Sequence, residues 1–243
     1  MKIFPITAFA VALCAGASAQ AGWQGWYLGA ELGDQDFSAD WSTEQFYEPN
    51  GDPFAPGPDS KESLDDSGVV AGLYVGQNFE FSARWVTGWE LHLTKASQDD
   101  EANRIPGFIP GGDSSIEVEA GNEASVLGRL GYLATPKLLV FATLGVSARD
   151  FEATTRCNGD GDFCNPATGL QENTEDGYET GWVMGVGLEA LLTDKLSARL
   201  DYRRADYGSF DVSGMSPNQD RFGVDAEVEA ETDTLSAGVS YSF

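Results

Sequence analysis

Ionisable side chains stand two residues apart in several otherwise apolar segments of this 243-residue chain. Glu90 and His92 form one such pair, and Arg199, Asp201 and Arg203 form a run of alternating charge. A histidine beside a carboxylate can serve general acid–base catalysis, whereas arginines beside carboxylates form ion pairs. Catalysis also requires a nucleophile within proven reach of the base. A single histidine among several charges is more often one member of an ionic network, which is the interpretation adopted here.

A spacing of two is the period of a β-strand, whose side chains point alternately to opposite faces. Alternation predicts eight strands, near 23–33, 67–77, 86–96, 123–133, 138–149, 178–192, 195–207 and 233–243. The last strand shows the pattern most clearly. Its apolar face holds Leu235, Ala237, Val239, Tyr241 and Phe243, and its other face holds only Thr, Ser and Gly.

Short and long connections alternate between these strands. The short ones are 78–85, 134–137 and 193–194, and the long ones are 34–66, 97–122, 150–177 and 208–232. This order is typical of outer-membrane barrels. We therefore predict an all-β fold, an eight-stranded antiparallel transmembrane up-and-down β-barrel with short periplasmic turns and long acidic extracellular loops. A soluble sandwich or lipocalin-like barrel is the alternative, but it would place its charges outside.

In such a barrel the apolar face of each strand meets lipid and the other face lines the lumen. The ionisable residues predicted to point inward are Glu31, Glu90, His92, Arg129, Arg149, Glu179, Glu189, Arg199, Asp201 and Arg203. Buried charges are costly unless they are paired, and eight strands leave an interior just wide enough for side chains to fill. The prediction is a salt-bridged polar plug, with no catalytic residue and no cofactor.

The first residues indicate export. Lys2 precedes an apolar run that ends at Gly16, and Ala17, Ser18 and Ala19 form a small-residue cleavage site. The run is shorter than the roughly 20 residues that a membrane-spanning helix needs. We predict a signal peptide over residues 1–19, cleaved after Ala19, and a single barrel domain over residues 20–243 in the outer membrane.

The charge of the chain is strongly negative, with 39 acidic and 14 basic residues. Such a field repels nucleic acid and attracts cations, although acidic loops most often serve only as a solvated surface. Asp160 and Asp162 are weak calcium candidates in an oxygen-rich segment, since the glycine and distal glutamate of an EF-hand are absent. We predict no other metal site.

Two cysteines, Cys157 and Cys164, remain after the predicted cleavage and flank that same segment. An even number of cysteines in an oxidising compartment predicts a disulfide between them. Aromatic residues are further expected to mark the two membrane interfaces. The candidates are Trp23, Trp85, Trp89, Tyr132, Tyr202, Tyr207 and Phe243.

Several segments together resemble a known family. Residues 182–208 are similar to the sixth-to-seventh strand hairpin of small outer-membrane barrels of alphaproteobacteria, and residues 25–30 are similar to their first strand. Residues 128–132, followed by Thr135 and Pro136, resemble the fourth strand and its turn. Tyr241 and Phe243 resemble the family's carboxy-terminal insertion signal. Members are called porin-like, opacity-type or immunogenic surface proteins, with an OmpA-like barrel. The resemblance implies assembly by the outer-membrane insertion machinery and no single shared activity.

The expected function is that of a non-enzymatic outer-membrane surface protein, acting in membrane integrity, adhesion or surface contact through acidic loops. A narrow porin for small solutes or cations is the alternative. A lipid-modifying enzyme similar to lipid A deacylases is a third hypothesis, with His92 and Thr94 in place of a lipid-facing His and Ser. The expected partners are outer-membrane lipid and lipopolysaccharide, the barrel-assembly machinery, and divalent cations at the loops. Nucleic acid is not expected, and the protein is predicted to be a monomer.

Overall fold

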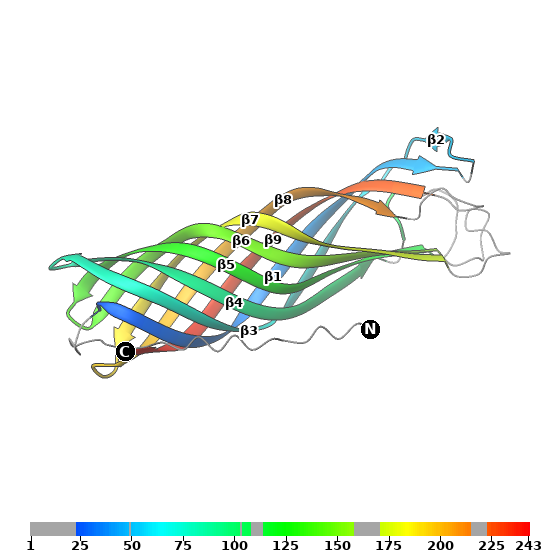
Figure 1. Cartoon of the computed structure of the whole chain (residues 1–243). Coiled ribbons are helices and arrows are strands. Elements are labelled where there is room, and N and C mark those ends of the chain that lie inside the picture. The colour runs from blue at the N-terminus through cyan, green and yellow to red at the C-terminus, as the bar shows by residue number, and fades with distance from the viewer. Residues whose placement is uncertain (1–22, 49, 103, 108–113, 158–170, 215–222) are drawn as a thin grey trace.

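The computed structural model describes residues 23–48, 50–102, 104–107, 114–157, 171–214 and 223–243. These residues form β-strands joined by turns (Figure 1). The strands are β1 (Gly25–Tyr47), β2 (Pro53–Phe54), β3 (Lys61–Ser82), β4 (Trp85–Ala102), β5 (Ser114–Thr135), β6 (Leu138–Cys157), β7 (Gln171–Leu191), β8 (Leu196–Gly214) and β9 (Gly223–Ser242). Within the described ranges, no helix has the length and apolar character that crossing a membrane requires.

Eight long strands make one closed antiparallel sheet. Each pairs with its neighbour along the chain, and β1 also pairs with β9, which closes the ring. β2 has only two residues and pairs with the end of β1. In the part where all eight strands pair, closure leaves no unpaired strand edge, so the backbone polar groups are satisfied inside the sheet, as lipid requires. Farther from the short turns, β3 and β4 stop pairing beyond Ala71 and Lys95, and β7 and β8 beyond Trp182 and Asp206. The predicted up-and-down β-barrel is confirmed.

The strands extend far beyond the predicted segments at one end of the barrel. β1 ends only at Tyr47 and β3 begins at Lys61, so both occupy much of the predicted loop 34–66. The predicted loops 97–122, 150–177 and 208–232 also contain strand on both sides. The extent predicted for these loops was wrong, because the outward face stops being apolar there while backbone pairing continues. At the other end the connections, which are 83–84, 136–137 and 192–195, are short, as predicted.

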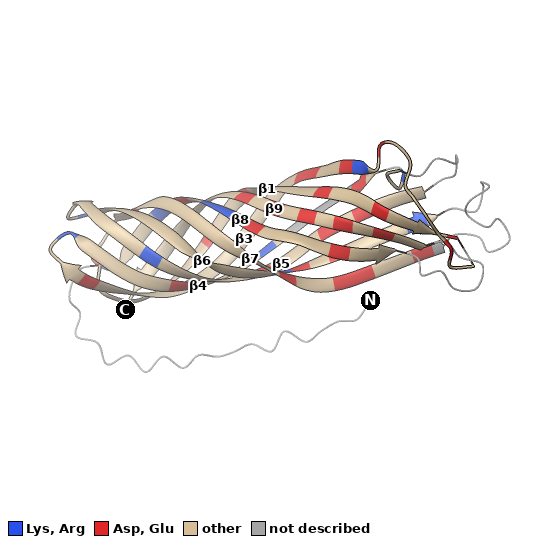
Figure 2. Cartoon of the chain, turned by 90° about the horizontal axis from the view of Figure 1, so that it is seen from above, with Lys and Arg blue, Asp and Glu red and all other residues tan. Residues whose placement is uncertain are grey.

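The outer face of β1 changes from apolar to acidic along its length. Leu28 and Leu32 are exposed on this face near the end with the short turns. Farther along, Asp34, Asp36 and Asp40 occupy the same face. Figure 2 shows the acidic residues gathered over one half of the barrel, the half that lies away from the short turns.

The other strands change at a matching level. Leu235 on β9 pairs with Asp34, and Asp233, the next outward residue of β9, pairs with Asp36. On β6 the change falls between Ala148 and Asp150. An apolar outer wall belongs in lipid and an acidic one in water. This level therefore marks the outer boundary of the membrane, and the acidic half is extracellular.

The interior changes in the opposite sense. In the membrane section β1 points Glu31 and Gln35 inward, and beyond it Phe37, Ala39 and Trp41 are buried instead. The latter three belong to an apolar core that fills the extracellular half. The other buried members are Phe46, Leu64, Ile105, Ile116, Val118, Ala120, Leu127, Phe151, Ala153, Cys157, Val183, Ala205, Tyr207, Val212, Val224, Ala226, Val228 and Ala230.

Five of the seven aromatic residues proposed for the interfaces are on the outer face, namely Trp85, Trp89, Tyr132, Tyr202 and Phe243. The prediction was wrong for Trp23 and Tyr207, which are both buried. Trp23 closes the periplasmic base, where its Nε1 donates to the Pro136 carbonyl oxygen at 3.2 Å. Tyr207 shares the inward face of β8 with Ala205, as its odd position dictates.

Some predicted features lie partly or wholly outside the described residues. Cys157 ends β6, where it is buried and disulfide-bonded. Its predicted partner Cys164, the calcium candidates Asp160 and Asp162, and the predicted signal peptide over 1–19 fall outside the described ranges. These assignments stay predictions.

The apolar core predicts that one buried tryptophan stabilises the extracellular half. Trp41 is 1% exposed and its Nε1 donates to Thr43 Oγ1 at 3.0 Å. Truncating a buried aromatic side chain costs about 3–5 kcal/mol, so Trp41→Ala is expected to lower the free energy of unfolding by that amount. Urea titration of the refolded barrel, followed by fluorescence, measures the change. Trp26→Ala, at a position 37% exposed on the outer wall, is the control in detergent, and an equal loss in both variants would contradict the prediction.

Candidate functional site

The chemically richest part of the protein is an ionic network in the membrane section of the lumen. Its centre is Glu90 on β4, which is fully buried. The Glu90 carboxylate accepts hydrogen bonds from Arg199 Nη1 at 3.0 Å, Arg129 Nη1 at 3.2 Å and the Tyr27 hydroxyl at 2.6 Å. His92 Nε2 lies 2.9 Å from its other oxygen. Two guanidinium groups, a tyrosine hydroxyl and a histidine ring thus surround one carboxylate, as a buried charge requires.

One side of the network continues toward the periplasm. Arg129 also pairs with Glu189 on β7, whose second oxygen accepts a hydrogen bond from Ser197 at 2.5 Å. The Arg129 guanidinium carbon lies 3.9 Å from the centre of the Phe141 ring. This stacking covers the flat face of the cation while its edge is hydrogen-bonded, an arrangement that suits arginine better than lysine.

The other side of the network continues toward the extracellular half. Arg203 Nη2 donates to Glu31 at 2.6 Å, and Ser236 donates to the second oxygen of Glu31 at 3.2 Å. Asp201 lies between two arginines, with 3.0 Å to Arg199 Nε and 3.6 Å to Arg203 Nε. Acids and arginines therefore alternate in space across the lumen.

His92 has polar neighbours at both ring nitrogens. Arg203 Nη1 lies 2.6 Å and Glu31 Oε1 3.3 Å from Nδ1, and Glu90 Oε2 lies 2.9 Å from Nε2. The ring also stacks on Tyr74, with 5.2 Å between ring centroids. Both nitrogens of this histidine are engaged, which leaves neither available as a general base.

Arg149 lies at the upper limit of the charged layer. It is fully buried, and its Nη1 lies 3.8 Å from Glu123 Oε2 on β5. Glu179 is opposite Arg149 in the β6–β7 register but is only half-buried, and no ion pair among the described residues includes it. β7 leaves β8 above Trp182, so Glu179 stands where the wall is less enclosed.

The structure thus brings nine of the ten predicted inward residues into the buried lumen and leaves Glu179 at its margin. The sequence analysis did not name several other members of the lumen network. They are the hydroxyl and aromatic residues Tyr27, Tyr74, Phe141, Ser197 and Ser236 and the acid Glu123. The signal was present, because each occupies an inward position by strand parity. Charge alone does not identify the hydroxyl and ring groups that complete a buried ionic network.

Little space remains inside the barrel between the two layers. A cavity of about 10 Å³ lies among Gln35, Thr94, Val183 and Arg203, which is room for roughly one water molecule. Above it is the apolar core, and below it the base is packed by Leu139 and other apolar side chains. Among the described residues, no group of three or more His, Cys, Asp or Glu side chains could hold a metal ion.

The outer wall of the extracellular half has a different chemistry. Asp225 Oδ2 accepts a hydrogen bond from the Tyr47 hydroxyl at 2.8 Å, and this bond raises the pKa of Tyr47. Arg204 on β8 pairs with Glu231 and Asp233 of the neighbouring strand. These contacts tie the acidic strands to one another on their water-facing side.

Closed strand order, an apolar outer band and a polar lumen agree with the sequence comparison. Over residues 6–243 the chain matches the family described as outer membrane protein beta-barrel domain. The chain belongs to this family. Its place in the outer membrane, predicted from the strand pattern and the resemblance, is confirmed by the same match and by the relatives' names.

Relatives of this barrel are named outer-membrane proteins. The 25 kDa outer-membrane immunogenic protein of Brucella abortus is 24% identical over 191 residues, which cover 73% of this chain and 79% of that protein. The 22 kDa outer membrane protein of Rhizobium leguminosarum is 32% identical over 98 residues, which cover 40% of this chain and 38% of that protein. The predicted resemblance to alphaproteobacterial surface barrels is confirmed.

A solved barrel shares the fold. OprG from Pseudomonas aeruginosa superposes with a TM-score of 0.53 at 16% identity, covering 92% of this chain and 98% of OprG. The outer membrane protease OmpT from Escherichia coli gives a TM-score of 0.50 at 10% identity, covering 89% of this chain and 97% of OmpT. At these identities the likeness concerns the fold alone.

The ionic network of this family member predicts strong coupling between buried partners. Arg129→Met leaves Glu189 buried without its arginine and is expected to cost about 3–5 kcal/mol of unfolding free energy. Adding Glu189→Leu removes the stranded charge, so the double variant is expected to recover much of that loss. Urea unfolding of the single and double variants in detergent measures the coupling.

Arg204→Met provides the control for that measurement. The side chains of Arg204 and Glu231 are each 41% exposed and that of Asp233 is 28% exposed, so the loss of Arg204 is expected to change stability by no more than about 1 kcal/mol. Additive losses at Arg129 and Glu189 would contradict the buried network.

Proposed function

We propose that this outer-membrane β-barrel is a non-enzymatic surface protein with a closed lumen. Its role is to contribute to membrane integrity and to contact its surroundings through its acidic extracellular half. The supporting observation is the filling of the interior in two layers. The ionic network around Glu90 occupies the membrane section, and the apolar core around Trp41 occupies the section beyond it.

The charges of the lumen favour a plug over a pore. A cation pore needs carboxylates that face a water-filled path, whereas Glu90 and Glu31 direct their oxygens at arginines. An ion would also have to pass Phe37, Phe151 and their neighbours in the apolar core. A narrow porin remains the alternative function to be tested against this proposal.

The surroundings of His92 do not support catalysis. A lipid-modifying enzyme with a lipid-facing histidine would need His92 on the outer wall, but this residue is 1% exposed and points into the lumen. Thr94 also faces the interior, at the small cavity. With both ring nitrogens hydrogen-bonded and space for about one water nearby, no substrate can approach, so a non-enzymatic role is the proposal.

The outer wall supports the second part of the proposal. The strands of the extracellular half are rich in acidic residues (Figure 2), and exposed ones such as Asp34, Asp36 and Asp40 face outward. This field favours cations over anionic polymers. The name of the Brucella relatives, outer-membrane immunogenic protein, supports a role at the exposed surface. We further propose that the barrel acts as a monomer and is inserted by the assembly machinery, which would read Tyr241 and Phe243 at the end of β9.

The closed lumen predicts electrical silence. Residues 20–243, refolded and inserted into a planar bilayer, are expected to give no single-channel steps, because neither layer leaves a continuous water path. Conductance at 1 M salt is the measurement. Steady current steps from the unmodified protein would overturn the proposal and establish the porin alternative.

A variant distinguishes silence from failed insertion. Arg129→Ala and Arg199→Ala together shorten two side chains that fill the ionic layer, while the apolar core above stays intact. This variant is expected to leak only when Phe37→Gly and Trp41→Gly are added to open the second layer. Current from the fourfold variant shows that the barrel inserts, and current from the twofold variant alone would show that the apolar core does not seal.

A further inference from the structure

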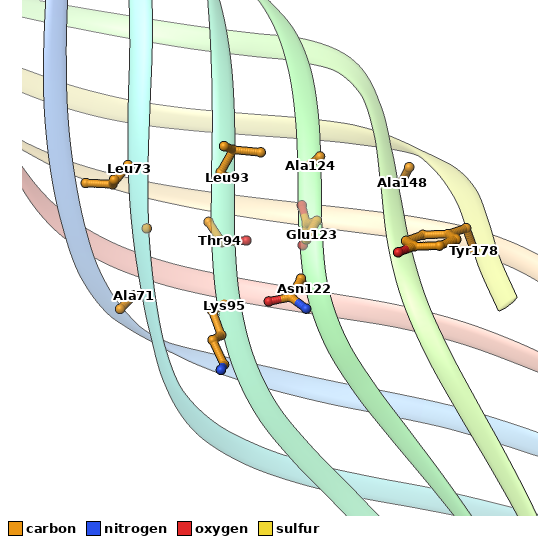
Figure 3. Close-up of a pocket in the computed structure, with 11 residues that line it drawn as sticks. Ala71, Leu73, Leu93, Thr94, Lys95, Asn122, Glu123, Ala124, Ala148 and Tyr178 are labelled. Carbon is orange, nitrogen blue, oxygen red and sulfur yellow. The ribbon is translucent and has the colours of Figure 1, made fainter. Parts of the chain in front are cut away.

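A groove crosses the outer wall of the barrel at the level of the membrane boundary. It runs over β3, β4, β5 and β6, has a volume of about 550 Å³ and is almost entirely apolar. Small residues, Ala71, Ala124 and Ala148, line its middle, and Leu73, Leu93 and Tyr178 stand around them (Figure 3). Gly72, Thr94 and Glu123 also belong to the lining. At this level β3 and β4 stop pairing beyond Ala71 and Lys95, and the register shifts after Lys95 in β4 and after Ala120 in β5.

The register places the groove across the boundary between lipid and water. Ala71 pairs with Leu32, the last outward apolar residue of β1 before the acidic positions. Ala148 immediately precedes the level of Asp150 on β6. The leucine end of the groove therefore lies among acyl chains, and its other end lies among lipid headgroups.

A lysine stands at the headgroup end. Lys95 and Asn122 lie together on that side of the groove, opposite Leu73 and Leu93 (Figure 3). Lys95 is exposed, and its amino group makes no ion pair or hydrogen bond with the described part of the chain. This is unexpected in a chain of net charge −25, because the other outward cation near this level, Arg204, pairs with two acids.

We propose that this groove binds one molecule of the anionic glycolipid of the outer leaflet, lipopolysaccharide, with Lys95 contacting a phosphate of its lipid A part. The apolar floor accommodates an acyl chain, and the positive charge at the top complements the phosphate. Tyr178, which is 77% exposed beside the groove, offers an aromatic ring to the sugar at headgroup depth. A lysine near an anionic lipid surface favours binding of that lipid. Its ammonium group acts as a point charge and does not need the fixed two-donor geometry with which arginine binds a phosphate. The site is on the outer wall, so it does not depend on whether the lumen is closed.

The test is a lipid titration of the refolded barrel in detergent, read by native mass spectrometry. Purified lipid A with both phosphates is the first probe, and lipid A without phosphates is the second. Lys95→Met is expected to weaken binding of the phosphorylated probe roughly fivefold and to leave binding of the dephosphorylated probe unchanged. Lys61→Met is the matched control, because Lys61 is exposed on the extracellular part of β3 and its loss changes the net charge equally.

A second variant tests the groove itself. Ala124→Phe keeps the outer wall apolar but fills the floor of the groove, so it is expected to weaken binding of both probes. Equal binding by Lys95→Met and the unmodified protein would overturn the phosphate contact, and equal binding by Ala124→Phe would overturn the acyl site. A dimer that dissociates in Ala124→Phe would overturn the proposal in favour of a second copy of the chain in the groove.

Discussion

Along every strand the surroundings of the outer wall change from lipid to water. Because side chains alternate between the two faces of a strand, the chemistry of the outer face and that of the inner face change at the same level. Where the outer face must be apolar, the inner face carries the charge, as with Leu32 outside and Glu31 inside. Where the outer face is acidic, the inner face is apolar, as with Asp36 outside and Phe37 inside. The same eight strands thus enclose two interiors of opposite chemistry.

The two interiors are stabilised by different forces. The apolar core lies inside a wall surrounded by water, so burial of side chains such as Trp41 contributes as in a soluble protein. In the membrane section the surrounding lipid is as apolar as a protein core. Hydrogen bonds and ion pairs in the lumen therefore stabilise this section. Glu90 holds Arg129 and Arg199 from two other strands, so the network ties distant parts of the wall across the lumen.

The two-residue alternation in the sequence was enough to predict most of the fold and many of the residues that line the lumen. The closed barrel, the short turns and the buried positions of Glu90, Arg129 and Arg199 follow from a period of two and an apolar outer stripe. The strands of the extracellular half were not predicted, because there the apolar side chains lie on the inner face and the acidic ones on the outer face. Asp34 and Asp36 end the apolar pattern and suggest a loop, although Phe37, Ala39 and Trp41 continue the alternation on the other face. The groove at Lys95 was also beyond prediction, since the register shifts at its level, after Lys95 and Ala120, have no fixed sequence signature.

The reversal at the level of Leu235 and Asp34 also fixes the barrel's depth. Sinking by one residue pair would draw a ring of carboxylates into hydrocarbon, and rising by one pair would bring leucine and valine side chains into water. Both displacements are energetically unfavourable, so the barrel has one preferred depth in the membrane. Lipid next to the barrel is then expected to adjust to the protein, because the protein does not shift along the membrane normal.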